Sequence, residues 1–410
     1  MRYSCKELLY DVSYYGLPTS GERNSFMGAI IPTKETTDII LEEGGNPLEL
    51  CYQCGLCTGV CPWNQVRDFS LRKLIHKTQM GLIDFEDEDL WRCTNCYACV
   101  KRCPRGVQVT HIMRAMRRVI MEVGAGKAPE SFRITVKNIA SVGNPLGEPP
   151  EKRMDWAKFT GVKTFTKGTE YLYFPCCYQA YDLGIQRVLR AAVYIMNKAN
   201  VDFGIPGSKV VCCGESARNG GAESLWHNLG ETNIKAFNEL GVKKIVVTSP
   251  HCYLAFKNDY PELGGNFEVV HILQLLAELV KEGKLKFTKP VNKRVTLHDT
   301  CCVGRREGMY DEPRLILNSI PGLELVEMRD SREYSLCCGG GCMGRIWMET
   351  KKGERFSDIR LEQALETGAG TLGVYCPYCM LNFDDTVLVS DKEKEIEIKD
   401  VLELASEALD

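Results

Sequence analysis

Two copies of one cysteine spacing constrain this chain more than any other feature. Residues 51–62 read CYQCGLCTGVCP and residues 93–104 read CTNCYACVKRCP, so both follow C-x2-C-x2-C-x3-C-P. Two intervening residues let the backbone curl round one iron–sulfur cube, while the fourth cysteine projects toward a second cube. The spacing therefore predicts two [4Fe–4S] clusters whose ligands cross between the runs. We expect one cluster on Cys51, Cys54, Cys57 and Cys103, and the other on Cys93, Cys96, Cys99 and Cys61.

Two other uses of cysteine fit the chain less well. Structural zinc sites use two C-x2-C pairs, whereas each run here has four cysteines and ends in Cys-Pro. Disulfide frameworks belong to small secreted domains, and this chain has 410 residues with 21 cysteines. Its first residues, MRYSCKELLYDVSYYG, lack the apolar core of a signal peptide. We therefore expect reduced, metal-binding thiols in a cytoplasmic protein.

Charge and hydropathy give no sign of a nucleic-acid partner or of a membrane-spanning segment. The net charge of −3 gives no reason to expect nucleic acid. No apolar stretch approaches the roughly 18–20 residues that a membrane span needs. Any attachment to a membrane is therefore expected to come through a partner subunit.

The segments around the second cysteine run have helical periodicity. Residues 69–80 and 107–123 are predicted to be helices, and the apolar residues of the second helix are predicted to face the core. The opposite side of that helix is predicted to be a solvated face of three arginines, Arg114, Arg117 and Arg118.

The composition changes after a segment that is rich in Gly, Pro, Lys and Glu, at residues 124–168. Short β-branched runs then alternate with amphipathic segments, which predicts α/β units. The predicted strands are 170–174, 244–248, 294–298 and 371–375. The predicted helices are 182–200, 222–240, 269–282 and 357–367.

The cysteines of this half repeat. Cys176–Cys177 and Cys212–Cys213 recur, at one constant offset, as Cys301–Cys302 and Cys337–Cys338. Cys252 recurs as Cys379 at nearly the same offset. Such matches of a rare residue indicate an internal duplication.

These features predict an α+β fold overall, in which a mainly α-helical double [4Fe–4S] ferredoxin-like domain precedes two homologous α/β lobes. The expected boundaries are an N-terminal extension at 1–45, the ferredoxin-like domain at 46–123, a linker at 124–168, the first lobe at 169–288 and the second lobe at 289–410.

The repeated pattern of one cysteine, Cys-Cys-Gly and a final Cys-x2-Cys resembles the cysteine-rich CCG domain. Together with the two ferredoxin-type runs, it makes residues 45–405 similar to the fused iron–sulfur subunit of the heterodisulfide reductase family. That family includes subunits of membrane redox complexes of sulfate reducers, and iron–sulfur oxidoreductases that link electron-transfer flavoprotein (ETF) to menaquinone. The resemblance implies a noncubane [4Fe–4S] cluster on the five cysteines of each intact CCG motif, and disulfide reduction at that cluster.

The second CCG motif is complete. The resemblance implies a noncubane cluster, with a catalytic role, on Cys301, Cys337, Cys338, Cys376 and Cys379. Cys302 stands where the family often has histidine, and Cys342 is an extra thiol. His298, Arg305 and Arg306 lie close enough in sequence to supply protons or bind an anionic substrate. A hydrogen-bonded residue at a strand end is an equal interpretation of His298.

The first CCG motif departs from the pattern. Three of its cysteines fit, namely Cys212, Cys213 and Cys252. Its entry cysteine is Cys177 by its distance from the preceding strand and Cys176 by the repeat offset, so both alternatives stay open. Ser249 replaces the first cysteine of the final pair, and serine is a poor iron ligand. We expect an altered cluster in this lobe, or none. Glu215 and Arg218, just after Cys-Cys-Gly, are spaced for a local ion pair.

The resemblance implies an oxidoreductase that is the iron–sulfur subunit of a membrane-associated complex. Electrons would pass through the two cubanes to or from the noncubane site, which would carry thiol/disulfide chemistry. The implied partners are a membrane quinone- or haem-binding subunit, a flavoprotein or other soluble carrier, and a small thiol or disulfide. The expected location is the cytoplasm, peripheral at the inner face of the membrane. The alternatives are a pure conduit from a soluble donor to a quinone or haem subunit, and a docking scaffold. The sequence has no G-x-G-x-x-G after a strand, so we expect no NAD(P)H or flavin site.

Overall fold

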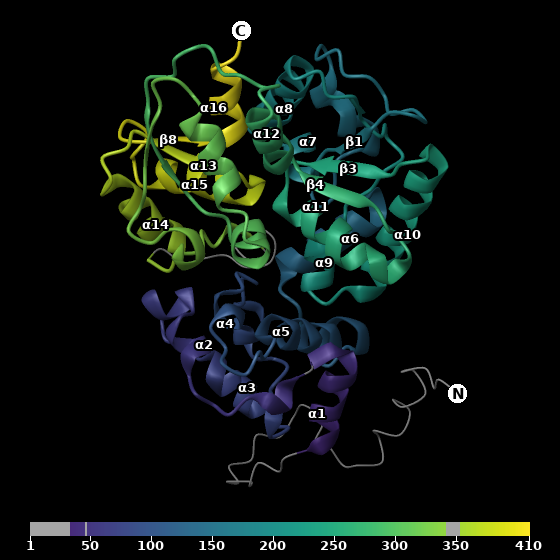
Figure 1. The fold of residues 1–410 in the computed structure, drawn as a ribbon. Coiled ribbons are helices and arrows are strands. Elements are labelled where there is room, and N and C mark those ends of the chain that lie inside the picture. The colour runs from purple at the N-terminus through teal and green to yellow at the C-terminus, as the bar shows by residue number, and fades with distance from the viewer. Residues whose placement is uncertain (1–32, 46, 342–352) are drawn as a thin grey trace.

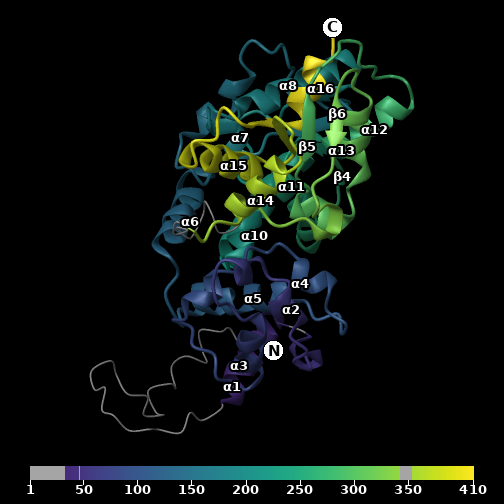
Figure 2. The same cartoon turned by 90° about the vertical axis from the view of Figure 1, so that its left-hand side faces the viewer.

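The computed structural model describes residues 33–45, 47–341 and 353–410. A helical part lies at one end of the molecule, and two α/β lobes lie side by side at the other end (Figure 1). Figure 2, turned by 90°, shows the same separation. Most of the predicted N-terminal extension, and Cys342, lie outside the described residues.

The helical part carries both ferredoxin-type runs on short elements. Its helices are α1 (Lys34–Ile40), α2 (Leu56–Gly59), α3 (Leu71–Gln79), α4 (Ala98–Lys101) and α5 (Val109–Arg118), which continues as a π-helical turn over Val119–Val123. The helices predicted at 69–80 and 107–123 are therefore present, and Ile112, Met113 and Met116 of α5 are buried as expected. The Ser70 hydroxyl begins α3 by accepting a hydrogen bond from the backbone N–H of Lys73.

The prediction of a solvated arginine face on α5 is wrong for Arg117, which is 0% exposed. Its guanidinium donates to the backbone carbonyls of Leu90, Cys93 and, in the first lobe, Asn219. Arg118 forms ion pairs with Glu43 and Glu223. The first lobe packs on this side of α5, so the charged stripe is an interface between two parts of the chain.

Residues of the predicted linker also form regular structure. They contain α6 (Glu130–Val142) and a 3-10 helix over Pro150–Ala157. Trp156 of the 3-10 helix is fully buried, and its ring lies edge-on to that of Tyr173 in the first lobe. This segment is therefore packed against the first lobe.

Each lobe has a four-stranded parallel sheet. The first sheet has the order β2-β1-β3-β4, and the second has β6-β5-β7-β8. The first contains β1 (Tyr171–Phe174), β2 (Phe203–Gly204), β3 (Lys244–Val247) and β4 (Glu268–His271). The second contains β5 (Arg294–Leu297), β6 (Glu324–Val326), β7 (Thr371–Val374) and β8 (Glu397–Asp400). An identical strand order in both lobes is what a duplication predicts.

Helices cover both sheets. In the first lobe they are α7 (Cys177–Tyr181), α8 (Gln186–Lys198), α9 (Glu215–Asn219), α10 (Glu223–Leu240), α11 (Pro250–Leu254) and α12 (Ile272–Lys281). In the second lobe they are α13 (Asp311–Asn318), α14 (Phe356–Leu365), α15 (Pro377–Val389) and α16 (Val401–Glu407). The four predicted helices are present. The one predicted at 269–282 is shorter, because β4 runs to His271 and the His271 side chain caps α12 by accepting the N–H of Leu273.

The topology brings the cysteine-bearing loops of each lobe together. Cys176 and Cys177 follow β1, and Ser249 follows the adjacent strand β3. In the second lobe, Cys301 follows β5 and Cys376 follows β7. The carboxyl ends of parallel strands meet at one edge of the sheet, which is where such folds place their sites. Among the described helices, none is long and apolar enough to cross a membrane.

Candidate metal centres

The two ferredoxin-type runs have the same local backbone. Gln53 and Gly55 in the first run have positive φ, and so do Asn95 and Tyr97 at the matching places in the second. Positive φ is uncommon for residues other than glycine and is retained where the surrounding structure requires it. These residues with a left-handed backbone turn each of the two runs tightly around its cysteines, as cluster binding requires.

The crossed assignment of the second cluster agrees with the side-chain positions. Cys61 and the three leading cysteines of the other run line one small cavity, which Trp63 and Phe69 close. Burial raises the pKa of Cys61 well above its ordinary value, and the thiolates of Cys96 and Cys93 raise it further. Four thiols that converge in a closed, largely apolar space are a suitable donor set for one cluster.

The first set lies nearer the surface. Cys54 is exposed, and Cys51, Cys57 and Cys103 are half-buried. Burial raises the pKa of Cys57, and the charges of Cys51 and Cys54 also raise it. Tyr52 lies beside both Cys54 and Cys103, which places Cys103 of the second run next to the first run. This set is the one that an outside redox partner could approach.

The crossing gives a direct prediction. Cys61→Ser should remove or alter the cluster of Cys93, Cys96 and Cys99 and leave the cluster of its own run intact, because the Cys61 thiol lies among the former. Electron paramagnetic resonance (EPR) of the reduced variant, compared with Cys103→Ser as the reciprocal control, would check this. Loss of the more exposed cluster in Cys61→Ser would contradict the assignment.

The five cysteines of the second CCG motif form one continuous group. Cys301 contacts Cys337, and the Cys338 Sγ lies 3.2 Å from the Cys379 Sγ. Cys376 completes the group through Cys379. All but Cys301 are buried, and Cys301 is half-buried. Bonds from neighbouring thiols hold the pKa of Cys301 and of Cys338 well below the ordinary value.

Two glycines are required beside this group. The backbone N–H of Gly339 donates to the Cys337 Sγ at 3.4 Å, and that of Gly340 donates to the Cys338 Sγ at 3.3 Å. A Cβ on Gly340 would lie 2.5 Å from the Tyr378 carbonyl oxygen, so no larger residue fits without movement. Backbone N–H groups that point at sulfur stabilise thiolate charge.

His298 belongs to the same group, and its ligand-capable nitrogen lies within 4.8 Å of both the Cys338 and Cys379 sulfurs. Its Nδ1 accepts a hydrogen bond from the Nε of Arg360 at 3.2 Å. Nε2 therefore carries the proton and is the nitrogen left to face Cys338, whose pKa the contact lowers. His298 is thus hydrogen-bonded on both ring nitrogens. Nδ1 accepts from Arg360, and Nε2 faces Cys338, which is a predicted cluster ligand.

Arg305 does not have the position of a substrate-binding residue. Its buried guanidinium donates to the carbonyl of Cys96 at 2.7 Å, to that of Glu333 at 3.1 Å and to that of Ser335. Arg306 donates to the Asn95 carbonyl at 3.2 Å. Both arginines hold the second lobe against the second ferredoxin-type run.

The contact between the second ferredoxin-type run and the second lobe also brings their cysteine groups together. The side chains of Cys96 and Cys337 lie next to each other, and Cys337 lowers the pKa of Cys96 to about 6. Thr94 Oγ1 lies 3.9 Å from the Cys337 Sγ. Cys96, Ala98 and Cys337 form a small buried cluster of their own between the helical part and the second lobe.

The first lobe also brings its cysteines together. Cys177 contacts Cys212, and Cys213 contacts Cys252. The strand register favours Cys177 as the entry cysteine. Phe174 pairs with Val247, two residues before Ser249. In the second lobe Leu297 pairs with Gly373. The next residue, His298, is therefore level with Val374, which stands two residues before Cys376. Cys177 follows Phe174 by three residues, as Cys301 follows His298.

Sequence reasoning missed His251, which lies in the first lobe and reaches into the second. Its ring nitrogens lie 3.9 Å from the Cys302 Sγ, and it contacts the Cys376 thiol. Its Nδ1 lies 3.0 Å from a Glu215 carboxylate oxygen. Burial opposes the imidazolium, but the charges of Glu215 and Cys376 hold the pKa of His251 well above its usual range. The expected Glu215–Arg218 ion pair is absent, since Arg218 binds Asp259 and Glu262 instead.

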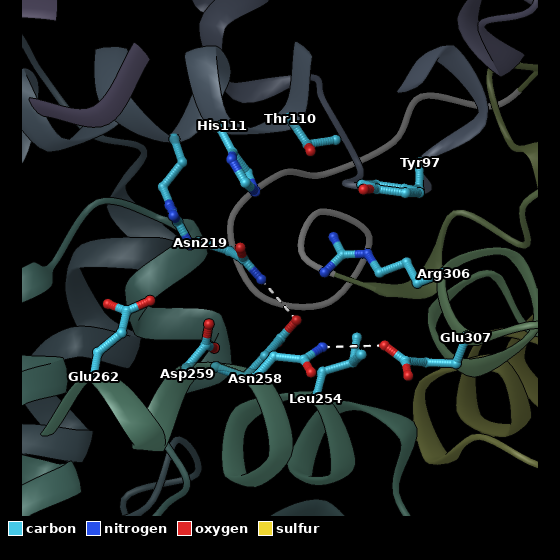
Figure 3. A pocket seen from close by; sticks show the side chains of 12 residues that line it. Tyr97, Thr110, His111, Asn219, Leu254, Asn258, Asp259, Glu262, Arg306 and Glu307 are labelled. Atoms are coloured by element: carbon cyan, nitrogen blue, oxygen red, sulfur yellow. Dashed lines mark hydrogen bonds between the residues drawn. The ribbon is translucent and has the colours of Figure 1, made fainter. Parts of the chain in front are cut away.

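A polar cavity of about 300 Å³ lies behind this pair. Figure 3 shows Thr110 and His111 of α5 on one wall, Asp259 and Glu262 of the first lobe opposite, and Arg306 of the second lobe reaching in. Glu215 lines the cavity and bonds to His251, so the pair connects the cavity with Cys376.

Comparisons with known proteins agree with this arrangement. Residues 171–257 and 295–384 each match the family described as cysteine-rich domain (CCG), and residues 47–107 match the 4Fe-4S dicluster domain. The chain is 31% identical over 412 residues to a subunit of the Dihydromethanophenazine:CoB--CoM heterodisulfide reductase of Methanosarcina barkeri, covering 92% of this chain and 97% of that protein. The chain belongs to the heterodisulfide reductase iron–sulfur subunit family. The names of its relatives describe an oxidoreductase and a subunit of a heterodisulfide reductase.

Other relatives of this heterodisulfide reductase family member are larger. EtfAB:quinone oxidoreductase of Syntrophomonas wolfei is 37% identical over 338 residues, which cover 79% of this chain and 47% of that protein. The chain thus spans about half the length of this curated relative. A solved structure of a hypothetical protein from Helicobacter pylori has a TM-score of 0.50 at 11% identity, covering 92% of this chain and 73% of that one. That similarity concerns the fold alone.

Proposed function

We propose that the chain is the electron-transfer subunit of a membrane-associated redox complex, with thiol/disulfide chemistry at the second CCG motif. The observation that carries this proposal is the contact between Cys96 and Cys337. It joins the buried ferredoxin-type cysteine set to the CCG set of the second lobe, while the other ferredoxin-type set lies near the surface. These observations support a surface entry set, a relay set and a terminal site, used in that order.

The donor sets suit the clusters that the family implies. Two sets of four thiols fit cubanes, and the five thiols of the second lobe fit a noncubane [4Fe–4S] cluster. When bound, these clusters would supply one-electron transfer and, in the second lobe, iron that binds sulfur. Arg305 and Arg306 keep the ferredoxin-type run in register with the second lobe, and the apolar wall of Trp63 and Phe69 excludes water from the relay set.

Disulfide reduction consumes two electrons and two protons and yields two thiols, so the site needs a proton donor. His251 is suited to hold a proton beside the Cys376 sulfur, because Glu215 and Cys376 both favour its charged form. Glu215 also lines the polar cavity, and we propose that protons reach the pair through it. His298 donates its Nε2–H to Cys338 and orients that ligand.

The test uses the full chain with its clusters reconstituted anaerobically. Dithionite-reduced protein mixed with the CoB–CoM heterodisulfide, the substrate in the name of the M. barkeri relative, should be reoxidised with the release of two thiols per disulfide. Added thiol should also shift the EPR spectrum of the second-lobe cluster. Reduced protein that is stable to the disulfide, with spectra that thiols do not change, would refute disulfide chemistry for this substrate.

A pure conduit is the second candidate, and one observation favours it. Four of the five second-lobe cysteines are buried, and among the described residues only Cys301 leaves this set partly open to solvent. In this case an ETF-type flavoprotein would reduce the exposed cluster, and a membrane quinone- or haem-binding subunit would accept electrons at the inner face. Reduction by an EtfAB flavoprotein, followed by reoxidation with a menaquinone analogue and no response to thiols, would support this alternative.

A further inference from the structure

The first lobe contains one more thiol at its cysteine group than the CCG pattern requires. Cys176, at the start of α7, is 4% exposed. Its thiol contacts the Cys252 thiol and lies beside the Ser249 hydroxyl. The Ser249 Oγ is fully buried and makes no hydrogen bond that satisfies standard geometry within the described part of the chain. Two candidate ligand groups, the Cys176 thiol and the Ser249 hydroxyl, therefore lie at the same place in the cysteine group.

The corresponding contacts in the second lobe show which position of the CCG motif this place is. There Cys376 contacts Cys379, which is the counterpart of Cys252. Cys176 thus makes to Cys252 the contact that Cys376 makes to Cys379. The remaining contacts also match, because the Cys177–Cys212 and Cys213–Cys252 pairs repeat Cys301–Cys337 and Cys338–Cys379.

The contacts between the two lobes show the same correspondence between Cys176 and Cys376. His251 of the first lobe contacts Cys376 of the second. Tyr378, the counterpart of His251 in the repeat, packs its ring 4.8 Å from that of Tyr178, two residues after Cys176. The rings of His251 and Tyr378 are 4.4 Å apart and nearly perpendicular. Each lobe therefore sends the residue that follows the proline of its final motif toward the cysteine group of the other lobe, and in the first lobe Cys176 lies at that contact.

We propose that Cys176 supplies the thiolate that Ser249 cannot supply, so that the first lobe binds an iron–sulfur cluster of its own. Its five ligands are Cys176, Cys177, Cys212, Cys213 and Cys252. A thiolate forms at an ordinary pH and binds iron strongly, whereas a serine alkoxide is too basic to form easily. Cys176 and Cys177, which the sequence offers as alternatives for the entry position, are thus both ligands.

The charge around this group supports a metal centre. Arg153 is fully buried, and its Nη1 donates to the Cys177 Sγ at 3.5 Å while its Nη2 donates to the Pro175 carbonyl at 3.2 Å. The Gly214 backbone N–H lies 3.5 Å from the Cys212 Sγ, as Gly339 does from Cys337. A buried cation and a backbone N–H beside the sulfurs offset the negative charge that a set of thiolates brings.

The test is the iron content and spectrum of the reconstituted full chain. The wild-type protein should bind about 16 iron atoms, four in each of four clusters. Cys176→Ala should lose about four of them and the matching Mössbauer component, while both cubane signals stay. The double variant Cys176→Ala/Ser249→Cys returns the thiol to the motif position and should regain the lost iron.

The controls separate a lost ligand from a damaged fold. Cys302→Ala removes a buried cysteine that belongs to none of the proposed ligand sets, and it should keep the wild-type iron content. Wild-type protein with about 12 iron atoms, or Cys176→Ala with as much iron as wild type, would overturn the proposal. So would a double variant that keeps its cubane signals and regains no iron. The inference rests on cluster loading alone, so it stands or falls independently of the disulfide-reduction assay.

Discussion

Cys337→Ala should abolish thiol-dependent turnover, with a loss of more than about 100-fold, because direct ligands matter more than the supporting residues whose loss costs 10–100-fold. Cys337 is the member of the second-lobe set that contacts the relay cysteine Cys96. Its removal therefore damages both the terminal site and its connection. The two ferredoxin-type sets keep all their cysteines, so dithionite should still reduce them.

The matched control for this prediction is Cys212→Ala. Cys212 holds the corresponding place in the first lobe, where it contacts Cys177, and no described contact joins it to a ferredoxin-type cysteine. Its removal should therefore reduce turnover much less. Steady-state activity and cubane EPR of both variants give the answer. Equal losses in the two variants would remove the distinction between the lobes, and full activity in Cys337→Ala would favour the conduit or a scaffold.

Arg305→Ala should separate the ferredoxin-type part from the second lobe. The change leaves three carbonyl groups without their charged donor, two of them beside cysteine sets, at Cys96 and Ser335. Hydrogen bonds to charged groups contribute about 1.5–3 kcal/mol each, so we expect a loss of at least about 3 kcal/mol in the free energy of unfolding. Electron transfer from the relay set to the second lobe should slow at least about tenfold, because their contact depends on this docking.

Urea unfolding and stopped-flow reduction of the loaded protein would measure these two effects. Arg329→Ala is the control, since Arg329 is 61% exposed and its ion pairs with described residues are long, at 3.7–3.8 Å. It should change stability by less than about 0.5 kcal/mol. An Arg305→Ala protein that unfolds and transfers electrons like wild type would show that the docking does not depend on this side chain.

The sequence predicted the elements that carry strong periodicity and missed those that depend on their neighbours. The central strands β1, β3, β5 and β7 were predicted within one residue at each end. None of the four outer strands was predicted. β2 has two residues, β6 has three, β4 lies in a segment that also fits a helix, and β8 has four residues at the second sheet's edge. Such strands form mainly because a neighbouring strand offers its free edge.

The same limit applies to the candidate site. The spacing within each ferredoxin-type run predicted which three cysteines could share a cluster, since that spacing is local, whereas the five ligands of the second CCG motif were implied by the family resemblance. The surroundings of Arg117, Arg305 and His251 come from other parts of the chain, so their roles could not be predicted. Only the position of His251, between Pro250 and Cys252 in the final motif, gave a signal in the sequence. The use of Cys176 beside Ser249 also depends on packing, because two residues more than seventy positions apart meet there.

The most direct test of the central claim is EPR of the loaded protein, recorded at two microwave frequencies while it is reduced stepwise. Cys96 of the relay set lies beside Cys337 of the second lobe. We therefore expect the two signals to split or broaden each other whenever both clusters are paramagnetic, and Arg305→Ala to weaken this interaction. Two signals that remain independent at every stage of the titration would contradict the arrangement on which the proposed function rests.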